Sequence, residues 1–230
     1  MKVYYFSGSG HTAAVAAYAA RRLSCEAAAI LPDMPAQSER TALVAFPVYC
    51  EDVPPVVKRF LYKLRAERIA LLAVYGGISF GNSLQRAYKC TNAALIAAAA
   101  VASGHTFLQE DTAFDPASLE PFFACLSAPV PIRLPACRAH PLARLFPGLR
   151  SRVGVKILRT SDCTACKTCN DACPQRAMHC GEPDAKCIRC MKCIHACPYK
   201  ALAFGPRPLL VRWLRKHRRG DTVVFLPQKT

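Results

Sequence analysis

Short, continuous apolar runs alternate along the first half of the chain with longer segments in which apolar residues recur at helical spacing. The apolar runs predict β-strands over residues 2–6, 26–31, 41–46, 69–75 and 104–109. The other segments predict α-helices over residues 11–23, 53–65, 81–100 and 116–125. Strands that are apolar at every position are typical of a parallel sheet with helices on both faces. The pattern therefore predicts a doubly wound α/β domain over residues 1–127.

Three loops of this domain follow predicted strands and carry polar, glycine or aromatic residues. Ligands of an open parallel sheet bind beyond the carboxyl ends of its strands, so we expect these loops to lie together. The candidate cofactor-binding residues in them are Ser7, Gly8, Ser9, Gly10, His11, Thr12, Pro47, Val48, Tyr49, Tyr75, Gly76, Gly77 and Asn82.

The first loop, Ser7–Thr12, has the composition of a site for one phosphate group. Gly8 and Gly10 allow close approach of the backbone to a ligand and positive φ angles. The free N–H groups at the start of the following helix favour an anion. A nucleoside triphosphate loop would contain a lysine, and this loop has none. Hydroxyls at positions 7, 9 and 12 suit a phosphate monoester instead.

The same loop also fits the dinucleotide-binding pattern G-x-G-x-x-A. Gly8, Gly10 and Ala13 occupy its positions, and Asp33 follows about twenty residues later, where that pattern has an acidic residue. An NAD(P)-linked reductase is therefore an alternative at this point.

The second half of the chain contains two cysteine runs of the same spacing, C-x2-C-x2-C-x3-C-P, which begin at Cys163 and Cys187. Zinc sites usually show paired C-x2-C elements or mixed cysteine and histidine sets. Disulfide frameworks are typical of small secreted domains. Neither pattern is a good match for four cysteines followed by proline.

The two runs resemble those of bacterial two-cluster ferredoxins. The resemblance implies a small α+β ferredoxin domain over residues 153–205 with two 4Fe-4S clusters. The fourth cysteine of each run would ligate the cluster of the other run. The implied ligands are Cys163, Cys166, Cys169 and Cys197 for one cluster, and Cys187, Cys190, Cys193 and Cys173 for the second.

The three loops of the first domain resemble the phosphate loop and the two ring-flanking loops of a flavodoxin. Together the two halves resemble the flavodoxin–ferredoxin fusion family of prokaryotes, over most of residues 1–205. This resemblance implies the strand order 2-1-3-4-5, bound FMN, and electron transfer between the flavin and the clusters. His11 stands where flavodoxins usually have asparagine. The single tryptophan, Trp213, lies outside the loops, so Tyr49 is the expected ring contact.

Positive charge is concentrated in the second half of the chain. Residues 128–230 carry a net charge of +15 out of +16 for the whole chain. Residues 128–152 are rich in proline and arginine and predict a linker, and residues 206–230 predict a basic amphipathic tail. Such a surface favours a redox partner with an acidic docking face. Positive charge alone is weak support for nucleic-acid binding. The basic tail is the candidate segment for contact with a membrane surface.

The sequence also limits the location and the kind of activity. It shows no signal-peptide pattern, and its longest apolar run, residues 93–102, is too short to span a bilayer. With clusters present, we expect a cytoplasmic protein. No catalytic dyad or triad is visible, and Cys180 is expected to be a packed thiol. The function predicted is electron transfer, and the alternative to a flavin carrier is a flavin-free docking domain attached to a ferredoxin.

Overall fold

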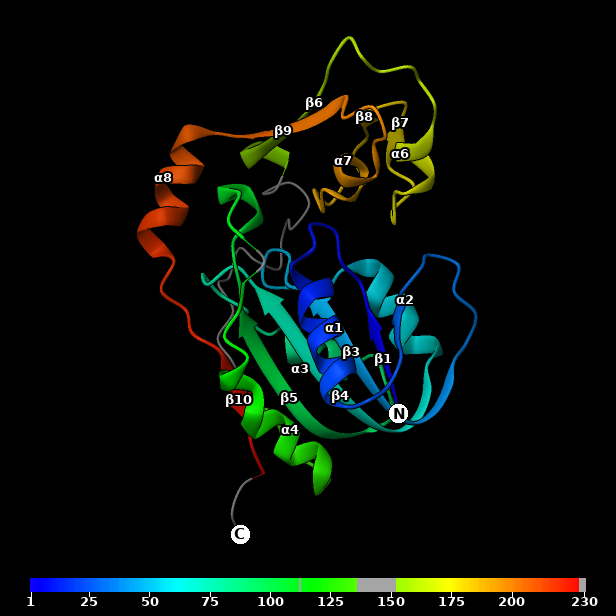
Figure 1. The fold of residues 1–230 in the computed structure, drawn as a ribbon, viewed down its shortest axis with the longest axis vertical. Coiled ribbons are helices and arrows are strands. Elements are labelled where there is room, and N and C mark those ends of the chain that lie inside the picture. The colour runs from blue at the N-terminus through cyan, green and yellow to red at the C-terminus, as the bar shows by residue number, and fades with distance from the viewer. Residues whose placement is uncertain (112, 136–151, 228–230) are drawn as a thin grey trace.

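The computed structural model describes residues 1–111, 113–135 and 152–227 and contains an α/β domain and a smaller cysteine-containing domain (Figure 1). The central sheet of the α/β domain has the order β10-β5-β4-β3-β1-β2. Its neighbouring strands are parallel except for β10 and β5. The strands of the first half are β1 (Lys2–Tyr5), β2 (Ala27–Ala29), β3 (Ser38–Pro47), β4 (Arg65–Tyr75) and β5 (Ala94–Ala102). The predicted spatial order 2-1-3-4-5 is confirmed, with one more strand at the β5 edge.

Helices cover both faces of this sheet, as the continuous apolar strands predicted. On one face, α2 (Pro55–Lys63) and α3 (Ser83–Tyr88) contribute Phe60, Leu61 and Leu84 to a buried core. On the other face, α1 (His11–Arg22) and α4 (Glu120–Ser127) contribute Val15 and Phe122 to a second core. The two cores lie on opposite sides of the same strands, which explains why those strands have no polar face.

The fifth strand is not the segment that the sequence predicted. A helix was predicted over residues 81–100, but α3 ends at Tyr88 and residues 94–102 form β5. Residues 104–109, predicted as a strand, contain the short 3-10 helix η1 (Thr106–Leu108). Alanine favours helices in isolation, but tertiary packing overrides that preference. Ala98 and Ala100 face one core while Ala97 and Ala99 face the other, the alternation that a buried strand requires.

The smaller domain repeats one local structure around its two cysteine runs. β6 (Val155–Arg159) pairs with β9 (Leu202–Pro206), and β7 (Met178–His179) pairs with β8 (Glu182–Pro183). The runs contain the short helices α6 (Thr168–Asp171) and α7 (Lys192–Ala196). Matching positions of the two runs have left-handed backbone angles, namely Ala165 and Arg189, Lys167 and Met191, and Arg176 and Lys200. The sequence repeat is therefore also a backbone repeat.

The C-terminal tail returns to the first domain. Helix α8 (Pro208–His217) begins with Pro208 and carries Arg215, Lys216 and His217 in its last turn. The chain then runs along one side of the first domain and forms β10 (Val223–Phe225), antiparallel to β5 (Figure 1). The tail is thus the edge of the central sheet as well as a basic helix.

Of the predicted linker, residues 128–135 and residue 152 lie within the described residues. Ile132 is buried there, and its backbone N–H donates to the carbonyl of Leu95 at 2.8 Å. Residues 136–151 lie outside the described residues. Within the described ranges, no helix has the length and apolarity that crossing a membrane requires.

The alanines of β5 predict a steric limit that can be tested. Replacing Ala99 with leucine inserts three carbons between the sheet and its covering helices, where Ala99 is fully buried. We expect the free energy of unfolding to fall by roughly 1–3 kcal/mol, because overpacking displaces side chains and backbone. Urea unfolding measures the change. Ala27→Leu, at an exposed position of β2, is the matched control and should have little effect.

Candidate functional site

A cavity of about 240 Å³ lies at the carboxyl ends of the central strands, where the candidate loops were expected to meet. The structure brings all three loops into its wall. The predicted residues that line it are Gly8, Ser9, His11, Thr12, Pro47, Val48, Tyr49, Tyr75 and Gly76.

Four predicted residues lie elsewhere. Ser7 and Gly10 line a neighbouring cavity, which shares Gly8 and Ser9 with the first. Gly77 and Asn82 line neither of these two cavities. The Gly77 carbonyl instead accepts hydrogen bonds from the backbone N–H groups of Arg219 and Gly220, at 3.0 and 2.8 Å, which ties the third loop to the tail.

Hydrogen bonds within and next to the loop Ser7–Thr12 fix its conformation. Gly10 has the predicted positive φ, 95°, and its N–H donates to the hydroxyl of Ser7 at 3.1 Å. The hydroxyls of Ser9 and Thr106 are hydrogen bonded at 2.7 Å. The hydroxyl of Thr12 is buried without a partner among the described residues. Because α1 has no side-chain cap at its N-terminus, its first N–H groups and Thr12 remain available for an anion.

Gly8 has a different role from the one predicted, because its φ is not among the positive ones. A Cβ atom at this position would overlap the carbonyl oxygen of Cys190, in the second cysteine run. The loop of the first domain therefore contacts the backbone of the second domain at Gly8, where no side chain lies between them.

Tyr49 stands at the same junction. Its hydroxyl is buried without a hydrogen-bond partner among the described residues, and it lies 2.9 Å from the position of a Gly8 Cβ. Burial, together with the nearby Cys190 thiol, raises the pKa of Tyr49 well above its usual value. Tyr49 is therefore a neutral donor between the loop cavity and the second cysteine run.

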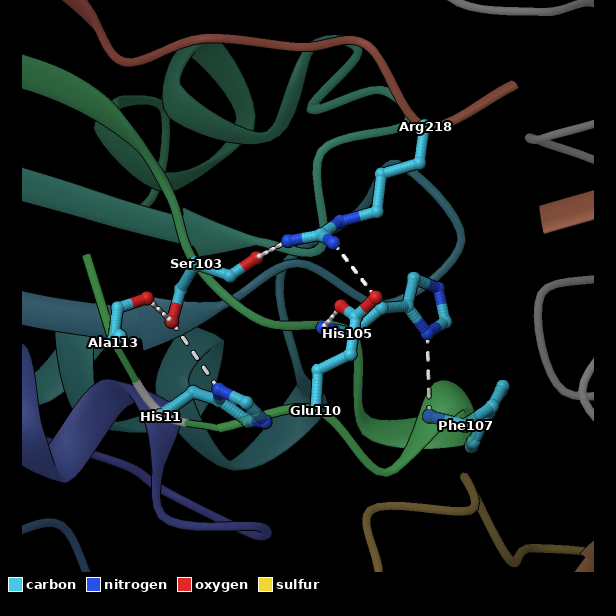
Figure 2. Close-up of polar contacts among 7 residues, drawn as sticks. All are labelled: His11, Ser103, His105, Phe107, Glu110, Ala113 and Arg218. Atoms are coloured by element: carbon cyan, nitrogen blue, oxygen red, sulfur yellow. Dashed lines mark hydrogen bonds and ion pairs between the residues drawn. The ribbon is translucent and has the colours of Figure 1, made fainter. Parts of the chain in front are cut away.

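A polar network adjoins the cavity through His11 and His105, which line it (Figure 2). The hydroxyl of Ser103 donates to the carbonyl of Ala113, and its oxygen lies 3.2 Å from Nδ1 of His11. Since the one hydroxyl proton is used, Nδ1 of His11 is the donor in that contact. Glu110 accepts from the backbone N–H of His105 at 2.8 Å and pairs with Arg218 of the tail at 2.7 Å.

His105 is neutral in this network. Burial lowers its pKa to about 4, although the nearby Glu110 opposes that shift. Nδ1 of His105 accepts a hydrogen bond from the backbone N–H of Phe107 at 3.2 Å, so the imidazole proton resides on Nε2 (Figure 2). The cavity wall thus holds a fixed imidazole tautomer rather than an acid–base pair.

Residues from the second half of the chain complete the cavity. They are Ile188, Arg189 and Cys190 of the second cysteine run and Leu210, Trp213 and Leu214 of helix α8. The single tryptophan, expected to lie outside the site, is therefore in its wall, and 45% of it remains exposed. Sequence reasoning did not place these residues or His105 in the cavity, because no local pattern shows that distant segments fold back on the sheet.

The eight candidate cluster cysteines fall into two groups. One cavity is lined by Cys173 together with Cys187, Cys190 and Cys193. Another is lined by Cys163, Cys166, Cys169 and Cys197, with Cys180 beside them. Among the described residues, however, no group of three or more His, Cys, Asp or Glu side chains is arranged to hold a metal ion. A cluster is a wider body than one ion, so thiolates that ligate it stand farther apart than the ligands of a single ion.

Burial sets the protonation of the inner cysteines. It raises the pKa of both Cys190 and Cys193 to about 12, and neighbouring thiols of the same group add to the shift. These sulfurs are therefore protonated thiols unless a positively charged group is bound. Iron is such a group, because a coordinated thiol loses its proton.

Comparisons with known proteins give limited results. No protein-family model and no curated protein matches the chain. One similar solved structure is described as a "putative flavoprotein" from Bacteroides eggerthii DSM 20697, with 18% identity and a TM-score of 0.32 over 41% of this chain and 84% of that one. Another "putative flavoprotein", from Bacteroides uniformis ATCC 8492, has 18% identity and a TM-score of 0.34 over 40% of this chain and 85% of that one. Likeness at this level carries no functional weight, so the cavity itself must support any assignment.

The contact between Gly8 and Cys190 predicts a strong effect of a single methyl group. Gly8→Ala places its Cβ against a backbone oxygen, which cannot rotate away, so the two segments must separate. We expect the free energy of unfolding to fall by roughly 1–3 kcal/mol, measured by chemical denaturation. In Gly205→Ala the new Cβ has its nearest neighbour at 3.6 Å, and this control should unfold at about the wild-type denaturant concentration. Equal stability of wild type and Gly8→Ala would contradict the contact.

Proposed function

We propose that this chain is an electron-transfer protein, with FMN in the loop cavity and two 4Fe-4S clusters at the two cysteine groups. The main support for the proposal is the position of Cys190. This residue lines both the loop cavity and the cavity that Cys173, Cys187 and Cys193 line. A redox cofactor in the loop cavity would therefore be adjacent to one of the clusters. FMN exchanges one or two electrons, whereas each cluster carries single electrons.

The residues of the loop cavity fit a flavin mononucleotide. Thr12 and the uncapped start of α1 offer donors to a phosphate, because neither has a side-chain hydrogen-bond partner among the described residues. Tyr49, Tyr75 and Trp213 provide aromatic surface for a flat ring in the same cavity. The aromatic and apolar side chains that line the cavity would also exclude water from the flavin ring.

The cysteine groups support a defined order of transfer. The group that contains Cys190 is next to the loop cavity, and burial and neighbouring thiols raise the pKa of Cys190 and Cys193. In the other group, Cys166 is exposed at the surface. Electrons would pass from the flavin to the inner cluster, then to the outer cluster, and from there to a partner.

The two alternatives from the sequence have less support. Asp33, the acidic residue of the dinucleotide pattern, pairs with Arg176 of the smaller domain at 2.7 Å and lines neither cavity. A flavin-free docking domain leaves the buried hydroxyls of Thr12 and Tyr49 without partners, at an energetic cost of about 1–3 kcal/mol each.

The partner and the cellular location follow from charge and chemistry. The excess of basic residues in the second half favours a redox partner with an acidic surface, which would increase the association rate. We place the protein in the reducing cytoplasm, where free thiols and clusters persist.

The experiment that tests the function is cofactor analysis of the full chain purified without oxygen. We expect about eight iron and eight sulfide per chain, as two four-iron clusters require, together with one FMN. Iron without flavin would favour the docking alternative. Tight NADH binding without extractable flavin would favour the reductase, and protein without iron or flavin would overturn the proposal.

The hydroxyl of Thr12 predicts a measurable part of the flavin affinity. Thr12→Val removes the hydroxyl and keeps the shape, so a charge-assisted hydrogen bond worth roughly 1.5–3 kcal/mol is lost. FMN should bind at least about tenfold more weakly, as measured by fluorescence quenching. Thr41→Val, in strand β3 away from the cavity, is the matched control and should bind FMN normally.

The crossed arrangement of the fourth cysteines predicts an asymmetric loss of iron. Cys173→Ala should lose the cluster of Cys187, Cys190 and Cys193 and retain that of its own run, because Cys173 lines the cavity of the second run. Iron content should fall by half, and electron paramagnetic resonance of the reduced protein should show one cluster. Cys180→Ala is the control and should keep its iron. Loss of the cluster of the first run would refute the crossing.

A further inference from the structure

The two cysteine runs differ at the positions that face the first domain. Run two carries Arg189, Lys192 and His195, and the equivalent positions of run one carry Ala165, Thr168 and Asp171. Both runs have the same cysteine spacing and the same left-handed backbone angles. The three basic residues are therefore not required to position the cysteines. The basic residues occur only in the run that contacts the phosphate-like loop.

Arg189 is a buried cation that has no ion pair within the described part of the chain. Only 8% of the residue is exposed, and its Nη1 has no hydrogen-bond partner among the described residues. Its Nε donates to the carbonyl of Val155 at 3.0 Å, and among the described residues no carboxylate forms an ion pair with it. Burying an unpaired charge is costly, so such a group favours a nearby anion, which either the proposed inner cluster or an anionic ligand of the loop cavity can supply. Arg189 lines the loop cavity together with Gly8, Ser9 and Thr12.

Lys192 lies on the other side of the same loop. It lines the neighbouring cavity with Ser7, Gly8, Ser9 and Gly10, and His195 lies there too. Its ammonium group is 5.7 Å from the centre of the Phe6 ring, immediately before the loop. The backbone contact between Gly8 and Cys190 fixes the second run against this loop, so the two cations flank Gly8 and Ser9.

We propose that Arg189 and Lys192 of the smaller domain bind the phosphate of the flavin that the loop Ser7–Thr12 cradles. The loop has no cation of its own, and the second run supplies the missing charge from another domain. The inference rests on the proposed flavin site and adds a specificity: the chain selects the phosphorylated flavin, FMN, over riboflavin. No bond is made or broken in this role.

The test compares two ligands that differ only in the phosphate. FMN and riboflavin are titrated into the full chain freed of flavin, and binding is read from flavin fluorescence at low and high salt. Lys192→Gln and Arg189→Met should each weaken FMN by about three- to tenfold at low salt, and riboflavin should change less than twofold. Lys192→Arg should restore FMN binding. Lys186→Gln, an exposed lysine of the same domain, is the matched control.

The outcomes separate this inference from the proposed function. The inference alone falls if the wild type binds FMN but the variants lower the affinities for FMN and riboflavin equally, or lower neither affinity. In either case the two cations do not bind the phosphate. If the wild type binds no flavin, the flavin site and the inference fall together. Should Arg189→Met fail to fold, the wild type still decides: FMN affinity must fall with salt while riboflavin affinity does not, because salt screens the phosphate charge. A salt-independent FMN affinity would overturn the inference.

Discussion

The contact of Gly8 with the carbonyl of Cys190 is the constraint on which the rest of the structure depends. At that point a loop of one domain meets the backbone of the other with no side chain between them. The contact places Cys190 in the wall of the loop cavity and brings Arg189 and Lys192 beside the loop. A single missing Cβ thus decides how close the loop cavity and the second cysteine run lie.

The tail secures this arrangement from the opposite side. Arg218 pairs with Glu110 and its Nη2 donates to the carbonyl of Ser103, near His11 and His105 (Figure 2). The hydroxyl of Tyr75 donates to the carbonyl of Asp221 at 2.6 Å. Helix α8 is held between these contacts and the smaller domain, where Leu210 packs close to Gly154. The cavity is therefore built by three segments that are far apart in the sequence.

Much of the fold could be predicted from the pattern of apolar residues, because fully apolar strands and glycine loops have strong local signals. The parallel sheet and the meeting of three loops followed from them, whereas the strand order was implied by the resemblance to flavodoxins. The run of alanines at residues 94–102 was misassigned because alanine satisfies either period, and only burial on both faces decides for the strand. Trp213, His105 and Arg189 could not be assigned to the site, since their positions depend on long-range contacts. The cysteine spacing predicted two groups of cysteines, but not which group lies beside the loops.

The pairing of β10 with β5 has a consequence for the order of assembly. Until residues 223–225 arrive, β5 is an edge strand of nine mostly apolar residues with unpaired backbone groups. Such edges invite pairing with other chains. During synthesis the first domain emerges early, whereas the strand that covers its edge is made after both cysteine runs. Strand β5 of the nascent first domain therefore remains an unpaired edge until the cysteine domain has been synthesised. Aggregation is most favoured during this interval.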